Sequence, residues 1–276
     1  MQISTVAIIG GLGKTGSRVA ERLKEHGINV RAASRSTSPS FDWQDRGTWH
    51  HALEGASAAY VTFQPDLAVA WAAEAISVFA RTAVEVGVGH IVLLSGRGED
   101  GAVLSEKELK TVGIDYTVLR ASWFNQNFSE GAFLDGLLQG KLALPAGDVV
   151  EPFVDAADLA DAALEVLTNP RHRNQTYEVT GPRALTFRDA VCEIATASGR
   201  AIEYETVPID AFIAEMAAFG LPTETTDLLH ELFTQVLDGR NSRVEDGVRQ
   251  ILGRQPKDFS DYARETAATG IWSVQS

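Results

Sequence analysis

The sequence predicts an α/β protein with a doubly wound, mainly parallel sheet. Three observations support this fold class. Short apolar runs alternate with helical patterns through the first half of the chain, and a glycine cluster separates the first strand from the first helix. The stretches between successive predicted strands are long enough for the crossovers that parallel pairing requires. Right-handed crossovers of this kind give an open sheet of the Rossmann type.

The predicted strands of the first half are short apolar runs at residues 6–9, 28–33, 59–63, 90–94 and 116–119. A helix over residues 17–26 is expected to end at Gly27, because a left-handed cap costs glycine least. A longer helix over residues 67–86 is opened by Asp66 and ends near Gly87. One further short strand is expected just before Phe41.

The alternation loosens after residue 122. The chain then predicts helices over residues 127–138, 187–198, 209–219 and 227–237, a helix from the Asp155 cap to residue 167, and a late strand at 177–179. Residues 140–152 are rich in turn formers. We therefore predict a Rossmann domain over residues 1–150. Residues 151–276 would add the last sheet elements and a smaller, mainly helical substrate or cap domain, packed so closely that the two could form one unit.

Composition narrows the class of protein. There are 24 Lys and Arg against 37 Asp and Glu, a net charge of −13 over 276 residues, which argues against nucleic acid or an anionic membrane as the main partner. No apolar run is long enough to cross a membrane, and the start lacks the pattern of a signal peptide. The single Cys192, expected in a helix core, excludes an internal disulfide, so a reduced, cytoplasmic setting is expected.

No metal is expected. No Cys/His cluster has the spacing of a zinc site. His50 and His51 are adjacent in a helical stretch, so we expect them to face different directions as solvated surface residues.

The glycine cluster predicts a dinucleotide site. It lies directly between the first strand and the first helix, where glycines allow a tight turn and let a pyrophosphate approach the positive end of the helix. The expected cofactor residues here are Gly10, Gly11, Leu12, Gly13, Lys14, Thr15 and Gly16. A triphosphate-binding P-loop is rejected because Ile8 occupies the position of its first glycine.

The end of the second strand favours NADP(H) over NAD(H). A carboxylate there would accept hydrogen bonds from the ribose 2′-hydroxyl and repel a 2′-phosphate. The chain has Ser34, Arg35 and Ser36 instead, with no acid, and Lys14 is close enough to add charge. The alternative is that Arg35 is only a solvated loop residue.

Other candidates follow later strands. Asp42, beside Trp43, would accept from the adenine amino group, while Thr62, Phe63 and Gln64 would line the nicotinamide ribose. Alternatively, Asp42 belongs to a plain surface turn. Ser95 ends a strand at the edge where ligands bind in open α/β sheets, so it would touch nicotinamide or substrate. Trp123, Phe124 and Asn127 would wall an aromatic substrate pocket or, alternatively, pack between domains. The catalytic candidates are Ser95, Phe124 and Asn127.

The usual carbonyl-reducing dyad is not found. It needs Tyr and Lys at i and i+4 on a helix, so that the cation lowers the pKa of the phenol. The positions four before the six lysines hold Gly10, Ala20, Val103, Glu106, Leu137 and Gly253. Tyr116 and Arg120 have the spacing but lie on a predicted strand, where residues four apart are roughly 13 Å distant.

Several motifs together resemble the NmrA-like atypical short-chain dehydrogenases/reductases. They lie at residues 10–16, 94–98, 115–120, 123–127, 152–155, 158–160 and 177–181, so the likeness covers most of the chain. Within the family, the chain looks most like the branch that contains the agroclavine and festuclavine dehydrogenases. The family's helical His and Glu would fall at Ala102 and Glu106, so only Glu106 is retained. Ala121 replaces the family's usual proline.

The resemblance implies an oxidoreductase in which NADP(H) delivers hydride to a small, largely apolar imine, iminium, activated alkene or quinone. An iminium becomes a neutral amine on accepting hydride, so no oxyanion needs a proton. The main alternative is a redox-sensing regulator that binds NADP(H) without turnover. An epimerase or isomerase fits less well, because it needs a proton-transfer pair. A monomer or homodimer is expected, acting on a small molecule without nucleic acid or membrane partners.

Overall fold

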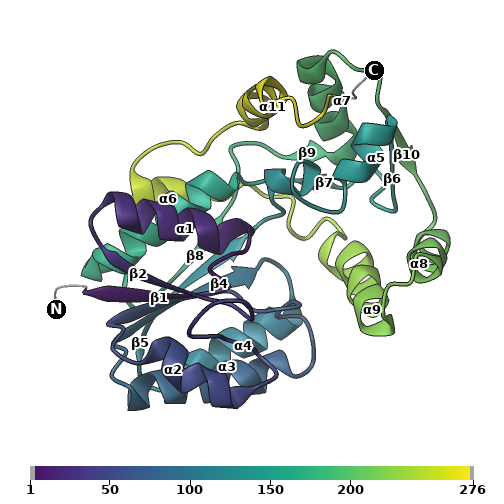
Figure 1. Ribbon diagram of the computed structural model, residues 1–276. Helices are drawn as coiled ribbons and strands as arrows, with labels where there is room; N and C mark the ends of the chain where they lie inside the picture. The colour runs from purple at the N-terminus through teal and green to yellow at the C-terminus, as the bar shows by residue number, and fades with distance from the viewer. Residues whose placement is uncertain (1–3, 274–276) are drawn as a thin grey trace. The chain divides into compact units, whose positions relative to one another are not determined.

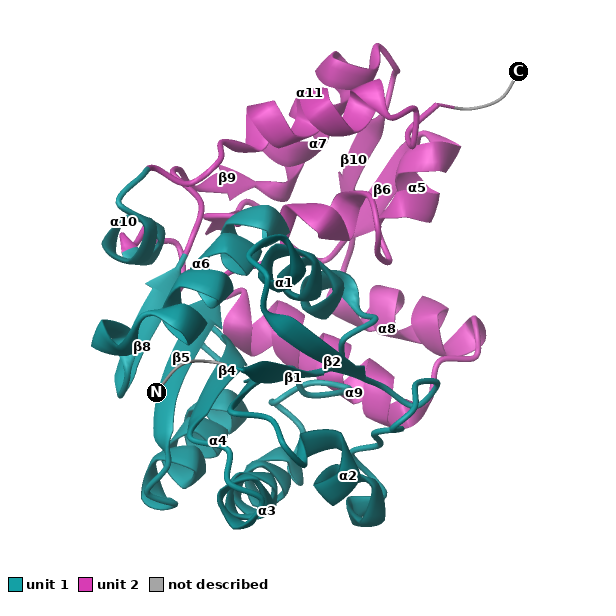
Figure 2. Ribbon diagram, turned by 60° about the vertical axis from the view of Figure 1, so that its left-hand side comes forward, with its two compact units in different colours: residues 1–121, 156–179, 247–254 teal, residues 122–155, 180–246, 255–276 magenta. Residues whose placement is uncertain are grey.

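The protein is described by a computed structural model over residues 4–273 and consists of two compact units (Figure 2). Unit 1 comprises residues 1–121, 156–179 and 247–254, and unit 2 comprises residues 122–155, 180–246 and 255–276. The sequence suggested a division at residue 150, but both units combine segments from before and after this residue. The reason is that a late strand completes the sheet of unit 1, whereas residues 122–150 already build unit 2.

Unit 1 is a six-stranded parallel sheet, as predicted (Figure 1). Its strands are β1 (Thr5–Ile9), β2 (Asn29–Ala33), β3 (Ala58–Val61), β4 (His90–Gly96), β5 (Asp115–Ala121) and β8 (Gln175–Val179), in the order β2-β1-β3-β4-β5-β8. The further strand expected before Phe41 is replaced by an isolated bridge between Ser34 and Ser40. Because β2 and β3 lie on opposite sides of β1, the order reverses there.

Helices cover both faces of this sheet (Figure 1). On one face lie α1 (Lys14–Glu25) and α6 (Ala156–Thr168), with α10 (Gly247–Leu252) packed on α6; on the other lie α2 (Trp49–Leu53), α3 (Ala72–Glu85) and α4 (Asp100–Thr111). Alternate residues of a strand face opposite sides, so Ala7 and Ile9 of β1 enter the core beneath α2, α3 and α4. Helix α3 begins later than predicted, because the Asp66 carboxylate accepts from Ala68 N (2.9 Å) in a local turn. Short 3₁₀ turns are η1 (Arg46–Thr48) and η3 (Pro170–His172).

Unit 2 combines two small sheets with helices. Strand β6 (Lys141–Leu144) pairs in parallel with β10 (Glu203–Thr206), and β7 (Val150–Glu151) pairs with β9 (Leu185–Thr186) in antiparallel fashion. The helical elements are η2 (Asn125–Phe128), α5 (Leu134–Gln139), α7 (Phe187–Ser198), α8 (Ile209–Ala218), α9 (Thr223–Glu231), the π-helix η4 (Leu232–Val236) and α11 (Phe259–Ala268). Residues 140–152, predicted as turns, thus contain two strands, and the helix predicted over 127–138 is split into η2 and α5.

Helix α7 shows how local sequence fixes an element of unit 2. A capping box joins Thr186 and Asp189 at its start, and Gly199 ends it in the left-handed region, which matches the predicted bounds. Its buried face consists of Phe187, Ala190, Val191 and Ile194. Cys192 lies off this face and is exposed, so its predicted place in the core is wrong.

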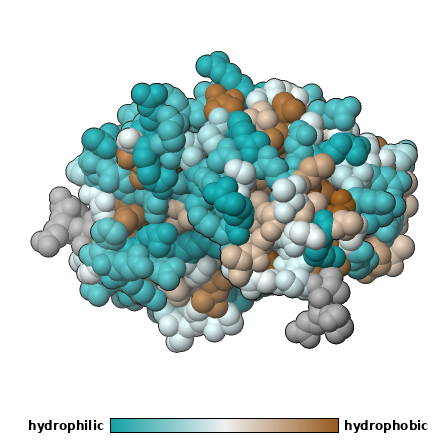
Figure 3. All heavy atoms as spheres, turned by 90° about the horizontal axis from the view of Figure 1, so that it is seen from above, coloured by the Kyte–Doolittle hydropathy of each residue, from teal (hydrophilic) through white to brown (hydrophobic). Residues whose placement is uncertain are grey.

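The surface has the mixed polar and apolar character expected from the composition. On the face drawn in Figure 3, hydrophobic side chains (brown) lie in small groups among hydrophilic ones (teal). Over residues 4–273, no helix combines the length and the apolar character that crossing a membrane requires.

Candidate functional site

The candidate site begins where the strand order reverses in unit 1. In open α/β sheets ligands bind at the carboxyl ends of the strands flanking such a point. Here the glycine turn follows β1 and Thr62 follows β3. The Thr62 hydroxyl donates to the carbonyl oxygen of Ile9 (2.9 Å), which ties the ends of the two strands together.

The glycine turn is too tight for side chains. A Cβ at Gly16 would lie 2.3 Å from the carbonyl oxygen of Gly10, and one at Gly11 would lie 2.7 Å from the Cβ of Ala32. Gly10 has a positive φ of 77°, and a Cβ there would meet the Thr62 hydroxyl at 2.1 Å. The predicted need for glycine therefore has a steric cause at each of these positions.

The first turn of α1 suits an anion. Gly13 is the N-cap residue and supplies no capping side chain, and the first turn contains no acid. The backbone N–H groups and the dipole of a helix N-terminus then favour negative charge. Lys14 and Thr15 begin the helix, and the Leu12 side chain before it is 61% exposed. The residues present thus fit the pyrophosphate of a dinucleotide.

The structure brings Ser34 and Arg35 next to this turn. The N–H groups of Gly10 and Gly11 donate to the carbonyl oxygen of Ala33 (2.9 and 3.2 Å), one residue before Ser34. The Ser34 and Ser36 hydroxyls lie 3.3 Å apart. Arg35 is exposed and has no ion pair or hydrogen bond with any residue between 4 and 273. Its guanidinium is therefore available to a phosphate.

The loop after β2 has a support that the sequence did not reveal. The Thr37 hydroxyl accepts from Ser34 N (2.8 Å) and lies 2.8 Å from the carbonyl oxygen of Pro39. A threonine three residues after a strand carries no specific signal, so only the folded loop identifies this role.

Trp43 and Phe63 lie mainly in the core of unit 1. Both are 8% exposed, their ring centroids are 4.6 Å apart, and Trp43 Nε1 donates to the carbonyl oxygen of Thr62 (3.1 Å). Asp42 is half-buried, and its carboxylate accepts from Gln44 N (3.0 Å), as in a plain turn. Gln64 is exposed. Thr62, Phe63 and Trp43 thus form one contiguous group beside the glycine turn, and their contact with a cofactor stays a prediction.

Ser95 faces an acid. It is 3% exposed, and its hydroxyl donates to Glu106 Oε1 (2.8 Å). Glu106 is 1% exposed and binds Arg120 through two hydrogen bonds, from Nε to Oε1 (2.7 Å) and from Nη2 to Oε2 (2.6 Å). Ala102, the other position of the family's pair, is fully buried. The Ser95 hydroxyl is thus engaged with Glu106 inside unit 1, and its contact with nicotinamide or substrate stays a prediction.

The ion pairs extend across three strands. Arg120 of β5 donates to Glu178 Oε1 (2.9 Å), and Arg97 donates to Glu178 Oε2 (3.0 Å). Arg120 and Glu178 are direct neighbours in the register of β5 and β8. The hydrogen bonds to Glu106 raise the pKa of Arg120. Sequence reasoning missed this network because its members are far apart in the chain and become neighbours only when the strands pair.

Phe124 and Asn127 belong to unit 2. Phe124 forms a parallel bridge with Val154 and accepts from Asn127 N at its carbonyl oxygen (3.0 Å). Both side chains are half-buried. Asn125, between them, is fully buried, and neither polar atom of its side chain has a partner among the described residues. The predicted residues of the reacting end are thus distributed over two units, Ser95 in unit 1 and these two in unit 2.

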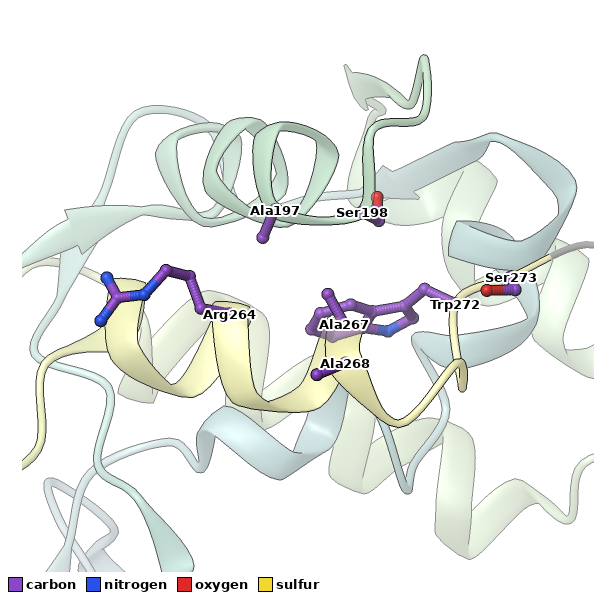
Figure 4. A pocket seen from close by; sticks show the side chains of 7 residues that line it. All are labelled: Ala197, Ser198, Arg264, Ala267, Ala268, Trp272 and Ser273. Atoms are coloured by element: carbon purple, nitrogen blue, oxygen red, sulfur yellow. The ribbon is translucent and has the colours of Figure 1, made fainter.

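Two other features offer less chemistry. A pocket of about 270 Å³ lies between α7 and α11, where Ala197 and Ser198 face Ala267 and Ala268 (Figure 4). It is smaller than usual ligand sites, and its Arg264 already pairs with Asp261. His50, His51 and Glu54 are all exposed, with one potential ligand atom from each within 4.8 Å of the others. The two histidines are therefore surface residues as predicted, but they do not diverge as far as expected.

The chain aligns over almost its whole length with known proteins. It is 29% identical to agroclavine dehydrogenase of Claviceps fusiformis over 289 residues, covering 98% of this chain and 99% of that protein. Among solved structures, it is similar to the NADPH complex of the quinone oxidoreductase QOR2 of Escherichia coli (TM-score 0.75, 23% identity, 94% of this chain and 99% of that chain). It is also similar to the negative transcriptional regulator NmrA in complex with NAD (TM-score 0.71, 15% identity, 99% of this chain and 100% of that chain). No family profile matches the chain.

The chain is thus similar over almost its whole length to dehydrogenases and oxidoreductases, and similar in fold to NmrA. Unit 1 has a Rossmann-like NAD(P)-binding fold, and the chain is an oxidoreductase. The resemblance found in the motifs is thereby confirmed over the length of the chain.

Proposed function

We propose that this protein is an NADP(H)-dependent reductase of a small, largely apolar substrate whose reacting carbon is already electron-poor. The proposal is supported by the hydrogen bonds from the glycine turn to Ala33, which join the start of a helix without an acid in its first turn to the loop with Arg35, a residue that has no partner between residues 4 and 273. One end of this surface suits a pyrophosphate and the other a 2′-phosphate. The cytoplasm, where the cofactor is abundant, is its proposed location.

Each residue has a defined part in binding. Gly10, Gly13 and Gly16 keep the turn close, and the first turn of α1 with Lys14 receives the pyrophosphate. Ser34 and Arg35 receive the 2′-phosphate. Phe63, held by Trp43, forms an apolar wall beside Thr62. When bound, the reduced nicotinamide supplies a hydride.

The proposed substrate class follows from the hydrogen bonds that engage the Glu106 carboxylate. Both carboxylate oxygens of Glu106 are engaged, by the Ser95 hydroxyl and by Nε and Nη2 of Arg120, so the carboxylate is not free to take part in proton transfer. A ketone would require a proton for the oxyanion that hydride addition creates, whereas an iminium would not. We therefore propose an imine or iminium, an activated alkene or a quinone. Ser95 acts by positioning Glu106, and Phe124 and Asn127 are proposed to contact the substrate.

The experiment compares two cofactors in two proteins. Titration calorimetry of the wild type and Arg35→Ala with NADPH and NADH should show a loss of about tenfold or more for NADPH, because a charged hydrogen bond contributes about 1.5–3 kcal/mol. NADH binding should change by less than about twofold. Equal losses for both nucleotides would refute the role of Arg35. Absorbance of reduced nicotinamide, followed with a panel of imines, enones and quinones, then tests turnover.

A second function is favoured by one observation. Glu106 is locked in ion pairs and Ala102 replaces the other member of the family's pair, so α4 carries no free acid–base pair among the described residues. This arrangement also suits a regulator that binds NADP(H) without turnover. Tight NADPH binding without oxidation across the whole panel would favour the regulator over the reductase.

A further inference from the structure

Helix α2 of unit 1 carries three metal-ligating side chains at its end. His50 and His51 lie in the helix, and Glu54 is its C-cap residue. One potential ligand atom from each lies within 4.8 Å of the other two, and His51 Nδ1 is 3.8 Å from Glu54 Oε2. The centroids of the two imidazole rings are 5.7 Å apart, with the rings at 80° to each other. Three donor groups therefore converge on one small part of the surface.

The position of Glu54 explains this convergence. On a helix, residues three and four apart are neighbours, whereas adjacent residues point in different directions. Glu54 follows His51 by three residues and His50 by four, so its carboxylate lies within reach of both rings. The sequence alone suggested two diverging histidines, because it took them as a pair without the acid that follows.

The backbone that carries the three side chains is fixed. Arg31 of β2 donates from Nη1 to the carbonyl oxygens of Glu54 and Ala52, the latter at 3.4 Å. Glu54 N donates to the carbonyl oxygen of His50 (2.9 Å). On the opposite side, the helix is anchored in the core by fully buried residues, Trp49, Ala52 and Leu53.

The side chains themselves are free to adjust. Those of His51 and Glu54 are 75% and 66% exposed. Zinc bonds to nitrogen and oxygen are about 2.0–2.2 Å long, which places tetrahedral donors roughly 3.3–3.6 Å apart. Small rotations of exposed side chains would close that gap. Between residues 4 and 273, Glu54 has no ion pair with Lys or Arg, so its negative charge is available to a cation.

We propose that His50, His51 and Glu54 form a surface site for a divalent transition-metal ion such as Zn²⁺. Two imidazole nitrogens and one carboxylate oxygen are a ligand set that zinc accepts, with the fourth position left to water. Calcium and magnesium prefer sites made of oxygen atoms, so they fit this set poorly. The bound ion would link α2 to the residue that ends it and so stabilise unit 1. The site is independent of the proposed reductase activity.

The test is calorimetric titration of the full chain, without an affinity tag, with zinc chloride. The wild type should bind one ion, and magnesium chloride should give no binding heat. His50→Ala, His51→Ala and Glu54→Gln should each weaken zinc binding by at least about tenfold, because even the outer partners of metal ligands contribute 10- to 100-fold. Zinc should raise the midpoint of thermal unfolding of the wild type more than that of these variants.

His26→Ala is the matched control. His26 is also an exposed histidine of unit 1, but its ring contacts the carbonyl oxygen of Arg22 and lies outside the cluster. This variant should bind zinc within twofold of the wild type. In NMR spectra, the ring signals of His50 and His51 should shift on addition of zinc, and that of His26 should not. No zinc binding by the wild type, equal binding by all variants, or an equal loss in His26→Ala would overturn the proposal.

Discussion

The turn after β1 and the turn after β4 have the same topology and opposite charge. Each follows a parallel strand of unit 1 and leads into a helix. The first contains glycines and no acid in the opening turn of α1, whereas Glu99 precedes α4 and Asp100 begins it. The arginine of the second turn, Arg97, already pairs with Glu178. An anion is thus attracted to the first turn and repelled by the second.

The comparison shows that topology alone does not make a phosphate site. The two helix N-termini carry the same backbone dipole, so the side chains of the first turn decide which of them an anion can approach. The turn after β4 is instead organised around buried ion pairs, which hold β4, β5 and β8 together. This division predicts that mutations in the second turn act on stability and mutations in the first act on dinucleotide binding.

The largest effect is expected at Glu106. Glu106→Gln keeps the shape but removes the charge that holds Arg120, and disrupting a buried pair costs about 3–5 kcal/mol. The free energy of unfolding, measured in urea, should fall by that amount. The control is Glu108→Gln on the same helix, where a partly buried acid accepts from Ser77, and a loss below about 1 kcal/mol is expected. Equal stability of the two variants would disprove the structural role of the network.

Acid should lower the stability of the protein through His90, the first residue of β4. Burial lowers the pKa of His90 from 6.5 to about 4, and His172 shifts in the same direction for the same reason. Below pH 6.5 the unfolded chain takes up a proton that folded His90 does not, so stability falls as pH drops from 6.5 to 4, by about 3 kcal/mol at most. Urea unfolding at several pH values measures this slope. His90→Gln should flatten it, and an unchanged slope would contradict the assignment.

Two matched glycine substitutions test whether the two turns differ in their role in NADPH binding. Gly16→Ala places a methyl group 2.3 Å from the Gly10 carbonyl oxygen, and Gly101→Ala in α4 places one 2.6 Å from the Leu67 carbonyl oxygen. Crowding of this kind costs about 1–3 kcal/mol, so both proteins should lose stability. Only Gly16→Ala should also lose NADPH affinity, by about ten- to a hundredfold in calorimetry. Comparable losses of affinity in both variants would remove the distinction.

The smallest effect is expected from a substitution that gives the turn after β1 an acid like those in the turn after β4. Ser17 is exposed near the start of α1, and Ser17→Asp would introduce a carboxylate there. NADPH binding should weaken by about two- to fivefold, while thermal stability stays equal or rises slightly because an acid suits a helix N-terminus by about 0.3–1 kcal/mol. Ser17→Asn is the control and should leave binding unchanged. Tighter binding in Ser17→Asp would contradict the electrostatic explanation.

The sequence predicted the sheet and the glycine turn because both depend on local signals. Buried parallel strands appear as apolar runs, and the spacing of Gly10, Gly13 and Gly16 reflects steric needs within one turn. The link between Glu106, Arg120 and Glu178 could not be predicted in this way, because it depends on which strands become neighbours. The same limit explains the domain boundary, which depends on the pairing of the late strand β8 with β5.

The interleaving of the two units has a consequence for biosynthesis. The sheet of unit 1 is completed by β8, and Gly247 of α10 then packs so closely on the backbone of β8 that a Cβ there would lie 2.1 Å from the carbonyl oxygen of Glu178. Arg254 then joins Asp158 and Asp161 of α6. A nascent chain therefore cannot finish its nucleotide-binding half until residue 254 of 276 has left the ribosome. Loss of the segment from residue 247 onward would remove part of both units together.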